Sequence, residues 1–435
     1  MTKRMLLAIL LLIVFALPAG CQKQGGEPTQ PTAPAPTILP THTPEPSPTP
    51  TPDPVGEALA GMTVEQKAAQ LLVAGIEGTE PGEDAVQAVQ GYQVGGVILF
   101  GRNVESAEQL AALTNGLKEL NGDYTPLFLC VDQEGGRVDR MPPEVTDLPS
   151  ALDFGSIADP EARMDACFTL GQTLAAQCAA FGFNMDFAPS LDIWSNPENT
   201  VIGDRAFGTD AATVTGAANE TALGILSGGV IPVAKHFPGH GDTAVDSHYG
   251  LPVVDKSLEE LEELELRPFR QAIDTTCVYG TYGGDTSIPA IMVAHILLSQ
   301  IDPDNPASLS PEVVTGLLRE EMGYEGVVCT DDLTMGAISN TYGMGEAAVL
   351  AVEAGCDLLL VCHGADNLAE AHAALVEAVD SGCIPEERLD ESVYRVLSLK
   401  TVYGLSNAPV EAPDIEALND RIAALERSIE ADTSQ

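Results

Sequence analysis

The chain has 435 residues, of which 45% are hydrophobic, so it can bury a large core and is not disordered as a whole. Its 64 Asp and Glu residues outnumber 20 Lys and Arg residues, which gives a formal net charge of −44 at pH 7. A surface this acidic repels phosphate backbones and acidic polymers, so nucleic acid is excluded as a partner, whereas a neutral ligand such as a sugar is not.

The first 21 residues have the pattern of a secretion signal. Lys3 and Arg4 precede an apolar run at residues 5–17, and this run is too short to span a membrane comfortably. The Leu-Pro-Ala-Gly-Cys sequence that ends at Cys21 resembles a bacterial lipobox. The resemblance implies that Cys21 is lipidated and that the protein is a membrane-anchored lipoprotein facing the cell wall. Plain secretion with a free Cys21 is the alternative.

Residues 22–55 are dominated by Pro, Thr, Gln and Glu, a composition that cannot form a core and is typical of a disordered, extended linker. An anchor followed by such a linker holds a folded domain away from a membrane. We expect this domain at residues 56–408, followed by an acidic C-terminal helix and tail at 409–435.

Beyond the linker, short apolar runs alternate with amphipathic stretches, which predicts repeated β-α units and a parallel sheet. The expected strands lie at residues 70–73, 96–100, 127–132, 183–188, 231–236, 290–295, 326–331 and 357–363. Expected helices include 107–120, 159–181, 311–322 and 414–430, and Ser310 is placed to cap the third of these. The predicted fold is α/β, a single (β/α)8 TIM-type barrel with no second α/β domain.

Most of these strands end in polar residues that can take part in chemistry. They are Asp132, the pair Lys235 and His236, His295, Asp331, and His363. Because the active site of a (β/α)8 barrel lies at the C-terminal ends of its strands, we expect these side chains to meet at one mouth.

Cysteine spacing gives no sign of a metal centre. None of the nine cysteines forms a C-x-x-C pair or a zinc-like cluster with histidine. Cys130, Cys329 and Cys362 lie in predicted strands, so we expect buried free thiols there.

The segment that follows the third strand contains Asp132, two glycines, Arg137 and Arg140. The glycines allow the backbone to turn tightly beside a ligand. A carboxylate with nearby guanidinium groups suits the hydroxyl and amide groups of a sugar. A β-α turn held by a salt bridge is the alternative.

The segment at residues 235–248 contains three His and two Asp residues. A metal site fits poorly, because Pro238 and the neighbouring glycines keep the stretch a loop without helical His spacing. Asp246 and His248 can instead form a hydrogen-bonded pair in which the carboxylate orients the imidazole for proton transfer.

Asp331 and Asp332 end the seventh strand. Side chains alternate along a strand, so we expect one to face the mouth and the other to face away. Asp331 suits the nucleophile of a glycosidase, with a helix cap as the alternative, and Asp332 is expected to cap the following helix.

Together these segments resemble glycoside hydrolase family 3, in its bacterial β-N-acetylhexosaminidase branch, over residues 62–405. The matching motifs are Gly95-Gly-Val-Ile-Leu-Phe100, Asp132-Gln-Glu-Gly-Gly-Arg137, Val201-Ile-Gly-Asp-Arg205-Ala-Phe-Gly208, Lys235-His-Phe-Pro-Gly-His-Gly-Asp-Thr243 with Asp246-Ser-His248, Arg267-Pro-Phe and Thr330-Asp-Asp-Leu-Thr-Met335.

The resemblance implies a retaining mechanism without metal or cofactor, in which Asp331 is the nucleophile and His248, paired with Asp246, is the acid/base. It also implies a first subsite for N-acetylglucosamine formed by Asp132, Arg140, Arg205, Lys235 and His236. The implied substrates are peptidoglycan fragments (muropeptides) or related oligosaccharides, and the protein is expected to be a monomer.

Three alternatives remain at this point. A phosphorylase on the same fold is possible because a neutral histidine leaves room for phosphate. The other two are a β-glucosidase and a non-enzymatic sugar-binding lipoprotein. Residues 275–287, rich in glycine and tyrosine, are expected to be a surface loop or to shape the leaving-group side.

Overall fold

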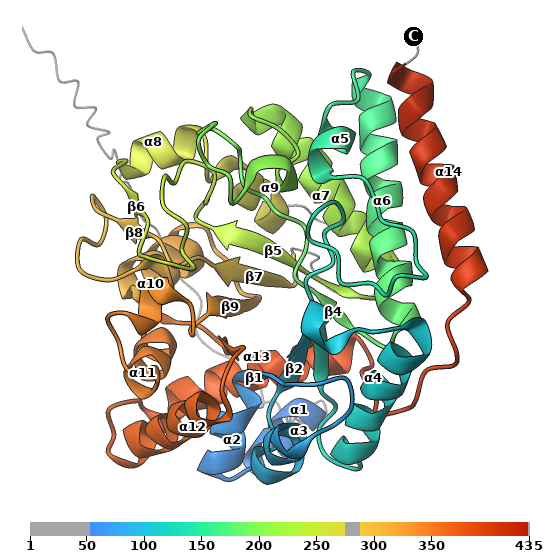
Figure 1. Cartoon of the computed structure of the whole chain (residues 1–435). Coiled ribbons are helices and arrows are strands. Elements are labelled where there is room, and N and C mark those ends of the chain that lie inside the picture. The colour runs from blue at the N-terminus through green and yellow to red at the C-terminus, as the bar shows by residue number, and fades with distance from the viewer. Residues whose placement is uncertain (1–52, 275–287, 434–435) are drawn as a thin grey trace, which may run out of the picture. The chain divides into compact units, whose positions relative to one another are not determined.

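The computed structural model describes residues 53–274 and 288–433, so the predicted signal, lipidated Cys21 and most of the linker lie outside the described residues, as does the loop at 275–287. In the described residues, eight parallel strands close into one barrel in the order β1-β10-β9-β7-β5-β4-β3-β2 (Figure 1). The strands are β1 (Leu72–Gly75), β2 (Gly96–Leu99), β3 (Phe128–Val131), β4 (Met185–Asp186), β5 (Ile231–Phe237), β7 (Ala290–Val293), β9 (Val327–Asp332) and β10 (Leu358–Val361). This confirms the predicted (β/α)8 fold, and no second α/β domain is present among the described residues.

Each barrel strand coincides with a predicted one, but some boundaries differ. Strand β1 begins two residues later than predicted because a capping box between Thr63 and Gln66 starts a helix that runs to Gln70. The linker also ends earlier than residue 55, because the Asp53 side chain caps a helix that begins at Pro54. A short parallel pair, β6 (Val253–Val254) with β8 (Leu297–Leu298), was not predicted.

Helices surround the barrel (Figure 1). In the first half of the chain they are α1 (Pro54–Ala60), α2 (Val64–Gln70), α3 (Glu83–Val86), η1 (Gln87–Tyr92), η2 (Gly101–Asn103), α4 (Ala107–Asn121), α5 (Ala151–Gly155), α6 (Pro160–Ala180), η3 (Gly203–Arg205) and α7 (Ala211–Ser227). The later helices are α8 (Leu258–Glu263), α9 (Arg267–Asp274), η4 (Ala307–Leu309), η5 (Glu312–Glu321), α10 (Gly336–Ser339), α11 (Met344–Ala354), α12 (Ala365–Asp380), α13 (Glu386–Val402) and α14 (Ile415–Thr433). As predicted, the Ser310 hydroxyl accepts a hydrogen bond from the third residue beyond it. No helix within the described ranges is both long and apolar enough to cross a membrane.

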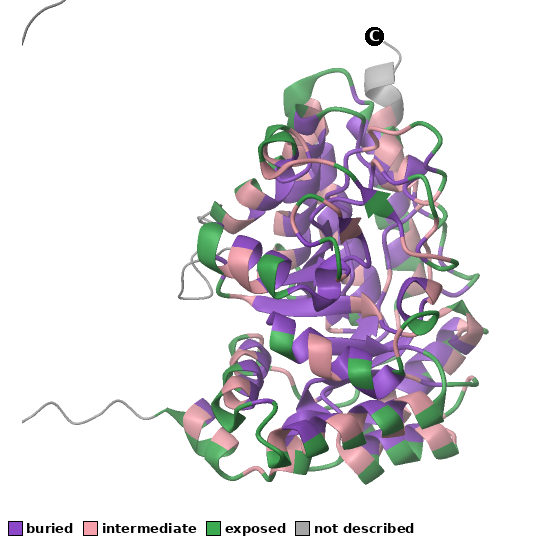
Figure 2. Ribbon diagram, turned by 90° about the vertical axis from the view of Figure 1, so that its left-hand side faces the viewer, coloured by how far each residue is buried: buried purple, intermediate pink, exposed green. Residues whose placement is uncertain are grey.

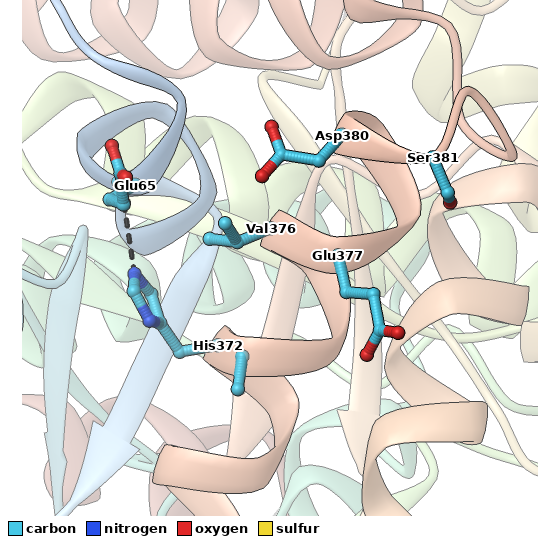
Figure 3. Close-up of a pocket in the computed structure, with 7 residues that line it drawn as sticks. Glu65, His372, Val376, Glu377, Asp380 and Ser381 are labelled. Carbon is cyan, nitrogen blue, oxygen red and sulfur yellow. Dashed lines mark hydrogen bonds between the residues drawn. The ribbon is translucent and has the colours of Figure 1, made fainter.

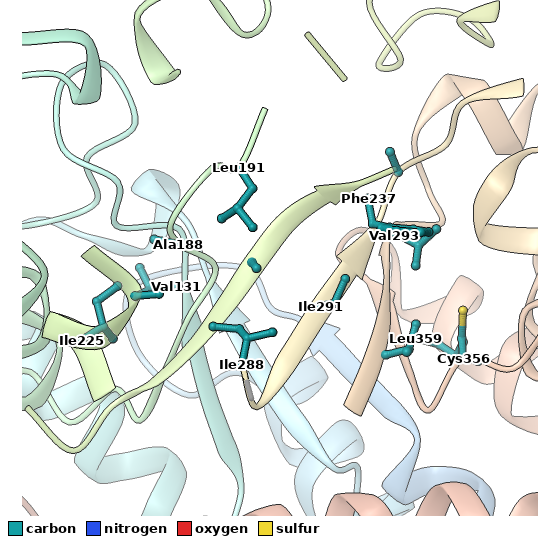
Figure 4. Packing of buried hydrophobic residues seen from close by; sticks show 14 of the residues in the cluster. Val131, Ala188, Leu191, Ile225, Phe237, Ile288, Ile291, Val293, Cys356 and Leu359 are labelled. Atoms are coloured by element: carbon teal, nitrogen blue, oxygen red, sulfur yellow. The ribbon is translucent and has the colours of Figure 1, made fainter. Parts of the chain in front are cut away.

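The strands divide the core into two layers. On β3, Phe128 and Cys130 face the barrel interior, whereas Leu129 and Val131 face the helices, as the alternation of side chains along a strand requires. Figure 4 shows part of the outer layer, and Figure 2 shows that burial is concentrated at the strands. The three cysteines predicted to be buried thiols, Cys130, Cys329 and Cys362, are buried and free.

Lys400 on α13 is buried near the start of the strands. Its ammonium group donates to Gln70 Oε1 and to the Gly95 carbonyl, both at 2.8 Å, and lies 4.8 Å from the centre of the Phe128 ring. Burial lowers the pKa of Lys400 to about 7, because removal from water disfavours the charged form.

Lys400 should therefore make the free energy of unfolding depend on pH. Between pH 7 and the pKa of an unfolded lysine near 10.4, unfolding takes up a proton, so stability rises with pH. We expect a rise of up to about 1.4 kcal/mol per pH unit that is absent from Lys400→Met. Urea unfolding of both proteins at pH 7 to 8.5 measures this difference, and identical slopes would contradict the assignment.

Candidate active site

A cavity of about 240 Å3 lies at the C-terminal ends of the barrel strands. Seven of the eight predicted catalytic and binding residues line it, namely Asp132, Arg140, Arg205, Lys235, His236, His248 and Asp331. The eighth, Asp246, lies behind His248 and is bonded to it. The cavity is smaller than the roughly 300–1,000 Å3 of most ligand pockets, which suits a ligand the size of one sugar.

A network of buried charges forms one wall of the cavity. The Lys235 ammonium contacts Asp132 and Glu134, both at 2.6 Å. Arg205 donates two hydrogen bonds to Glu134, of 2.9 and 2.7 Å. Burial alone would raise the pKa of Glu134, but Arg205 and Lys235 outweigh it and hold this pKa well below its usual range.

His236 lies between this network and a buried carboxylate. Its Nδ1 is 2.6 Å from Asp192 Oδ2, and its Nε2 is 3.4 Å from an Arg205 nitrogen. An arginine can only donate, so this geometry fits an imidazole with its proton on Nδ1. The pairing of β5 with β7 shifts register between Ala234 and Phe237, which lets the consecutive residues Lys235 and His236 both line the cavity.

Arg137 does not line the cavity but organises the loop that carries Arg205. Its guanidinium group donates to the carbonyls of residues 200, 201 and 202 and pairs with Asp204 at 2.9 Å. Gly135 and Gly136 have φ values of +84° and +56°, so the predicted tight turn at these glycines is present.

Asp331 lies half-buried at the end of β9, with one carboxylate oxygen accepting the backbone N–H of Asp332 at 2.8 Å. Burial would raise the pKa of Asp331, but His295, His236 and this N–H outweigh it, so the pKa is lowered. The group is therefore an ionised carboxylate at neutral pH.

Two predictions for neighbouring residues are wrong. Asp332 does not cap helix α10, because its carboxylate accepts from Thr334 and from the Cys362 backbone instead, and it also borders the cavity. The strand predicted to end at His295 ends at Val293, and His295, two residues beyond it, does not line the cavity. Its two ring nitrogens bond to Ser308 Oγ at 2.7 Å and to the Asp332 carbonyl at 2.9 Å, so its ring contacts the last residue of β9.

His248 is held in a turn with Asp246. The Asp246 carboxylate lies 2.8 Å from His248 Nδ1 and also accepts the His248 backbone N–H at 2.9 Å. Burial opposes the charge on Asp246, but the backbone and ring of His248 outweigh it, and the pKa of Asp246 is lowered. The His248 side chain is 63% exposed, so its Nε2 is open to the cavity and to solvent.

The other polar residues of this loop have structural partners. The pKa of His240 is lowered to about 4 by burial, and its ring nitrogens contact Thr243 and Ser247. Asp242 forms an ion pair with Lys256 at 2.9 Å. In the described part of the chain, no group of three or more His, Cys, Asp and Glu residues is arranged to hold a metal ion.

Residues 63–399 match the family model of the glycosyl hydrolase family 3 N terminal domain, over most of the chain. The chain belongs to glycosyl hydrolase family 3. It is therefore a glycoside hydrolase, and the alternative of a sugar-binding lipoprotein without activity is set aside.

Relatives of this family 3 enzyme agree with the assignment. A β-hexosaminidase of Nitrosomonas eutropha is 35% identical over 331 residues, which cover 75% of this chain and 91% of the relative. A β-hexosaminidase of Methylococcus capsulatus is 40% identical over 287 residues, which cover 66% of this chain and 80% of that relative. The solved structure of a family 3 β-N-acetylglucosaminidase from Paenibacillus sp. str. FPU-7 is 40% identical with a TM-score of 0.77, over 85% of this chain and 69% of that chain.

Sequence reasoning missed two carboxylates of the family 3 site, Glu134 and Asp192. Glu134 lies within the Asp132–Arg137 motif, and its position directly before the Gly135-Gly136 turn was the available signal. Asp192 follows the fourth strand at a distance, and only the fold brings it to His236.

Glu134→Gln should damage both stability and substrate binding in this family 3 enzyme. The change leaves Lys235 and Arg205 without their shared buried charge, which costs about 3–5 kcal/mol of unfolding free energy. We also expect KM for a sugar substrate to rise by roughly tenfold or more, since both cations line the cavity.

The pH dependence of this stabilisation has a definite sign. Because the pKa of Glu134 is depressed in the folded protein, the stabilisation is complete above the unfolded pKa near 4.5 and is lost as pH falls below it. Urea unfolding from pH 7 to pH 3 should show that the free energy of unfolding falls more steeply with decreasing pH for the parent than for Glu134→Gln. The exposed Glu105→Gln is the control, and a Glu134 variant that behaved like it would refute the role.

A second hollow lies on the helical layer, away from the strand ends (Figure 3). It is lined by α12 residues such as His372, Glu377 and Asp380 and by Glu65 of α2. The His372 ring bonds to the Glu65 carbonyl at 2.9 Å, which ties the two helices together.

Proposed function

We propose that this chain is a retaining exo-β-N-acetylglucosaminidase. One observation carries the proposal, which is that an ionised Asp331 and His248, whose ring is bonded to Asp246, border the same cavity of single-sugar size. A retaining glycosidase needs a nucleophile and a proton donor at one anomeric centre.

In the first step, an Asp331 oxygen forms a bond to the anomeric carbon while the glycosidic bond breaks. His248 donates its proton to the departing oxygen, and Asp246 stabilises the imidazolium before the transfer. In the second step, His248 removes a proton from water, the water oxygen bonds to the anomeric carbon, and Asp331 leaves. Two displacements restore the β configuration.

The first subsite is assigned to five residues around the charge network, which are Asp132, Arg140, Arg205, Lys235 and His236. Carboxylate and cationic groups held in fixed positions can accept from and donate to sugar hydroxyl and amide groups. The network holds Lys235 and Arg205 in place before a sugar arrives, which lowers the cost of ordering them on binding. The small cavity supports an enzyme that removes one terminal sugar.

The natural substrate we propose is a peptidoglycan fragment, and the enzyme would act outside the cytoplasm as a lipoprotein. The signal-like residues 1–21, the lipobox-like end at Cys21 and the extended linker support this location. A Cys21→Ala variant should lose incorporation of labelled palmitate and leave the membrane fraction; unchanged labelling would count against anchoring through Cys21.

Rates on two aryl glycosides that differ only at the sugar 2-position test the activity. We expect the soluble domain to hydrolyse the β-N-acetylglucosaminide at least tenfold faster than the β-glucoside, and comparable rates would overturn the proposed specificity. A parallel reaction with inorganic phosphate separates hydrolysis from phosphorolysis, because only the latter yields the sugar 1-phosphate.

A further inference from the structure

The loop that carries His248 is attached to the segment that directly follows Asp331. The N–H groups of Gly336 and Ala337 donate to the carbonyls of His248 and Ser247, at 3.2 and 3.0 Å. The Asn340 side-chain amide donates to the Tyr249 carbonyl at 3.2 Å. Three consecutive carbonyls of the loop are therefore bound by residues 336–340, which we call the docking segment.

The two backbone donors are available because they start helix α10, where N–H groups have no partner within the helix. The docking segment begins four residues after Asp332, the last residue of β9. One continuous stretch of chain thus carries the proposed nucleophile and holds the loop of the proposed proton donor.

Gly336 is needed for the close approach of the two segments. A Cβ atom at this position would lie 2.6 Å from the His248 carbonyl oxygen and 3.1 Å from the Tyr249 carbonyl carbon. Both are backbone atoms, so they cannot yield as a flexible side-chain end can. Any side chain at position 336 would push the loop away from α10.

The remaining contacts of the loop link the position of its backbone to the position of the His248 ring. Ser247 is buried, and its hydroxyl contacts His240 Nε2 at 3.2 Å. The Asp246 carboxylate binds both the backbone and the ring of His248, and the Asp246 carbonyl accepts from Tyr249 at 3.0 Å. The turn is thus compact, so a shift of its carbonyls moves the ring as well.

We propose that Gly336 and Asn340 are positioning residues that set where His248 stands relative to Asp331. This inference rests on the proposed function, in which His248 is the acid/base. It adds that the geometry of proton transfer is determined by the docking segment, not by the His248 loop alone.

The test compares Gly336→Ala and Asn340→Ala on two β-N-acetylglucosaminides, one with an activated dinitrophenol leaving group and one with a poorly activated phenol. In the first displacement, which kcat/KM reports, a displaced proton donor matters only where the leaving group needs protonation. We expect kcat/KM on the poor substrate to fall by roughly tenfold for Gly336→Ala and roughly threefold for Asn340→Ala, with the activated substrate within about twofold of the parent.

Azide supplies a readout that a merely structural role would not change. It attacks the glycosyl-enzyme without a general base, forming a bond to the anomeric carbon and releasing Asp331. Azide should therefore raise kcat of both variants on the activated substrate and leave the parent unchanged.

Matched controls are Gly316→Ala, where a new Cβ lies no closer than 3.7 Å to another group, and Ser339→Ala, whose hydroxyl bonds only to Met335 of its own turn in the described contacts. Equal loss on both substrates, or no loss, would overturn the proposal. If Gly336→Ala does not fold, Asn340→Ala alone decides, because its exposed side chain makes one loop contact. A parent inactive on both glycosides would instead overturn the proposed function.

Discussion

Asp331→Asn should reduce kcat by roughly 10⁴-fold while the affinity for N-acetylglucosamine stays within a few-fold of the parent. Asparagine has the same shape and can still accept the Asp332 N–H, so the end of β9 keeps its geometry. The amide carries no negative charge and cannot form the glycosyl-enzyme, so the loss falls on chemistry and not on binding.

Single-turnover kinetics and calorimetric titration with N-acetylglucosamine measure the two effects separately. Slow deamidation of asparagine would restore some aspartate, so Asp331→Ala serves as the control. In the alanine variant, azide can attack the anomeric carbon directly and release an activated phenol, giving the inverted glycosyl azide. Full turnover by Asp331→Asn would remove Asp331 from the nucleophile role.

The sequence allowed the barrel and most of the cavity to be predicted, for a physical reason. Apolar runs that end in a polar residue mark strands whose ends face the mouth, and Asp132, Lys235 and Asp331 follow this rule. His295 also follows an apolar run, yet it does not line the cavity, because Ser308 and the Asp332 carbonyl bind the two nitrogens of its ring. The end of a strand predicts where a side chain is attached, but it does not predict which group that side chain contacts.

The support of the site could not be predicted, because it depends on contacts between distant segments. Asp192 meets His236 across 44 residues, and Glu134 meets Arg205 across 71. No pattern within either short segment of sequence predicts such pairs. The docking of the His248 loop on α10 is a further case, because two of its three donors are backbone groups that any sequence possesses.

His248→Ala should show a loss that depends on the leaving group. Proton donation by a positioned side chain contributes roughly 10²–10⁴-fold, so kcat/KM on a disaccharide or a poor phenol should fall by that amount. With an activated dinitrophenol, bond cleavage needs no proton, and kcat/KM should stay within about tenfold of the parent.

The second displacement, in which water releases the sugar from Asp331, gives this prediction a second measurable result. Water still needs a base when the glycosyl-enzyme breaks down, so the variant should accumulate that intermediate on the activated substrate and show a burst of phenol release. Azide should relieve the block, because it needs no deprotonation. The exposed Tyr249→Ala is a control from the same loop, because only its backbone carbonyl takes part in the described docking contacts. An equal loss on both substrates, with neither burst nor azide effect, would mean that another group transfers the proton and that the exposed imidazole beside Asp246 only shapes the mouth of the cavity.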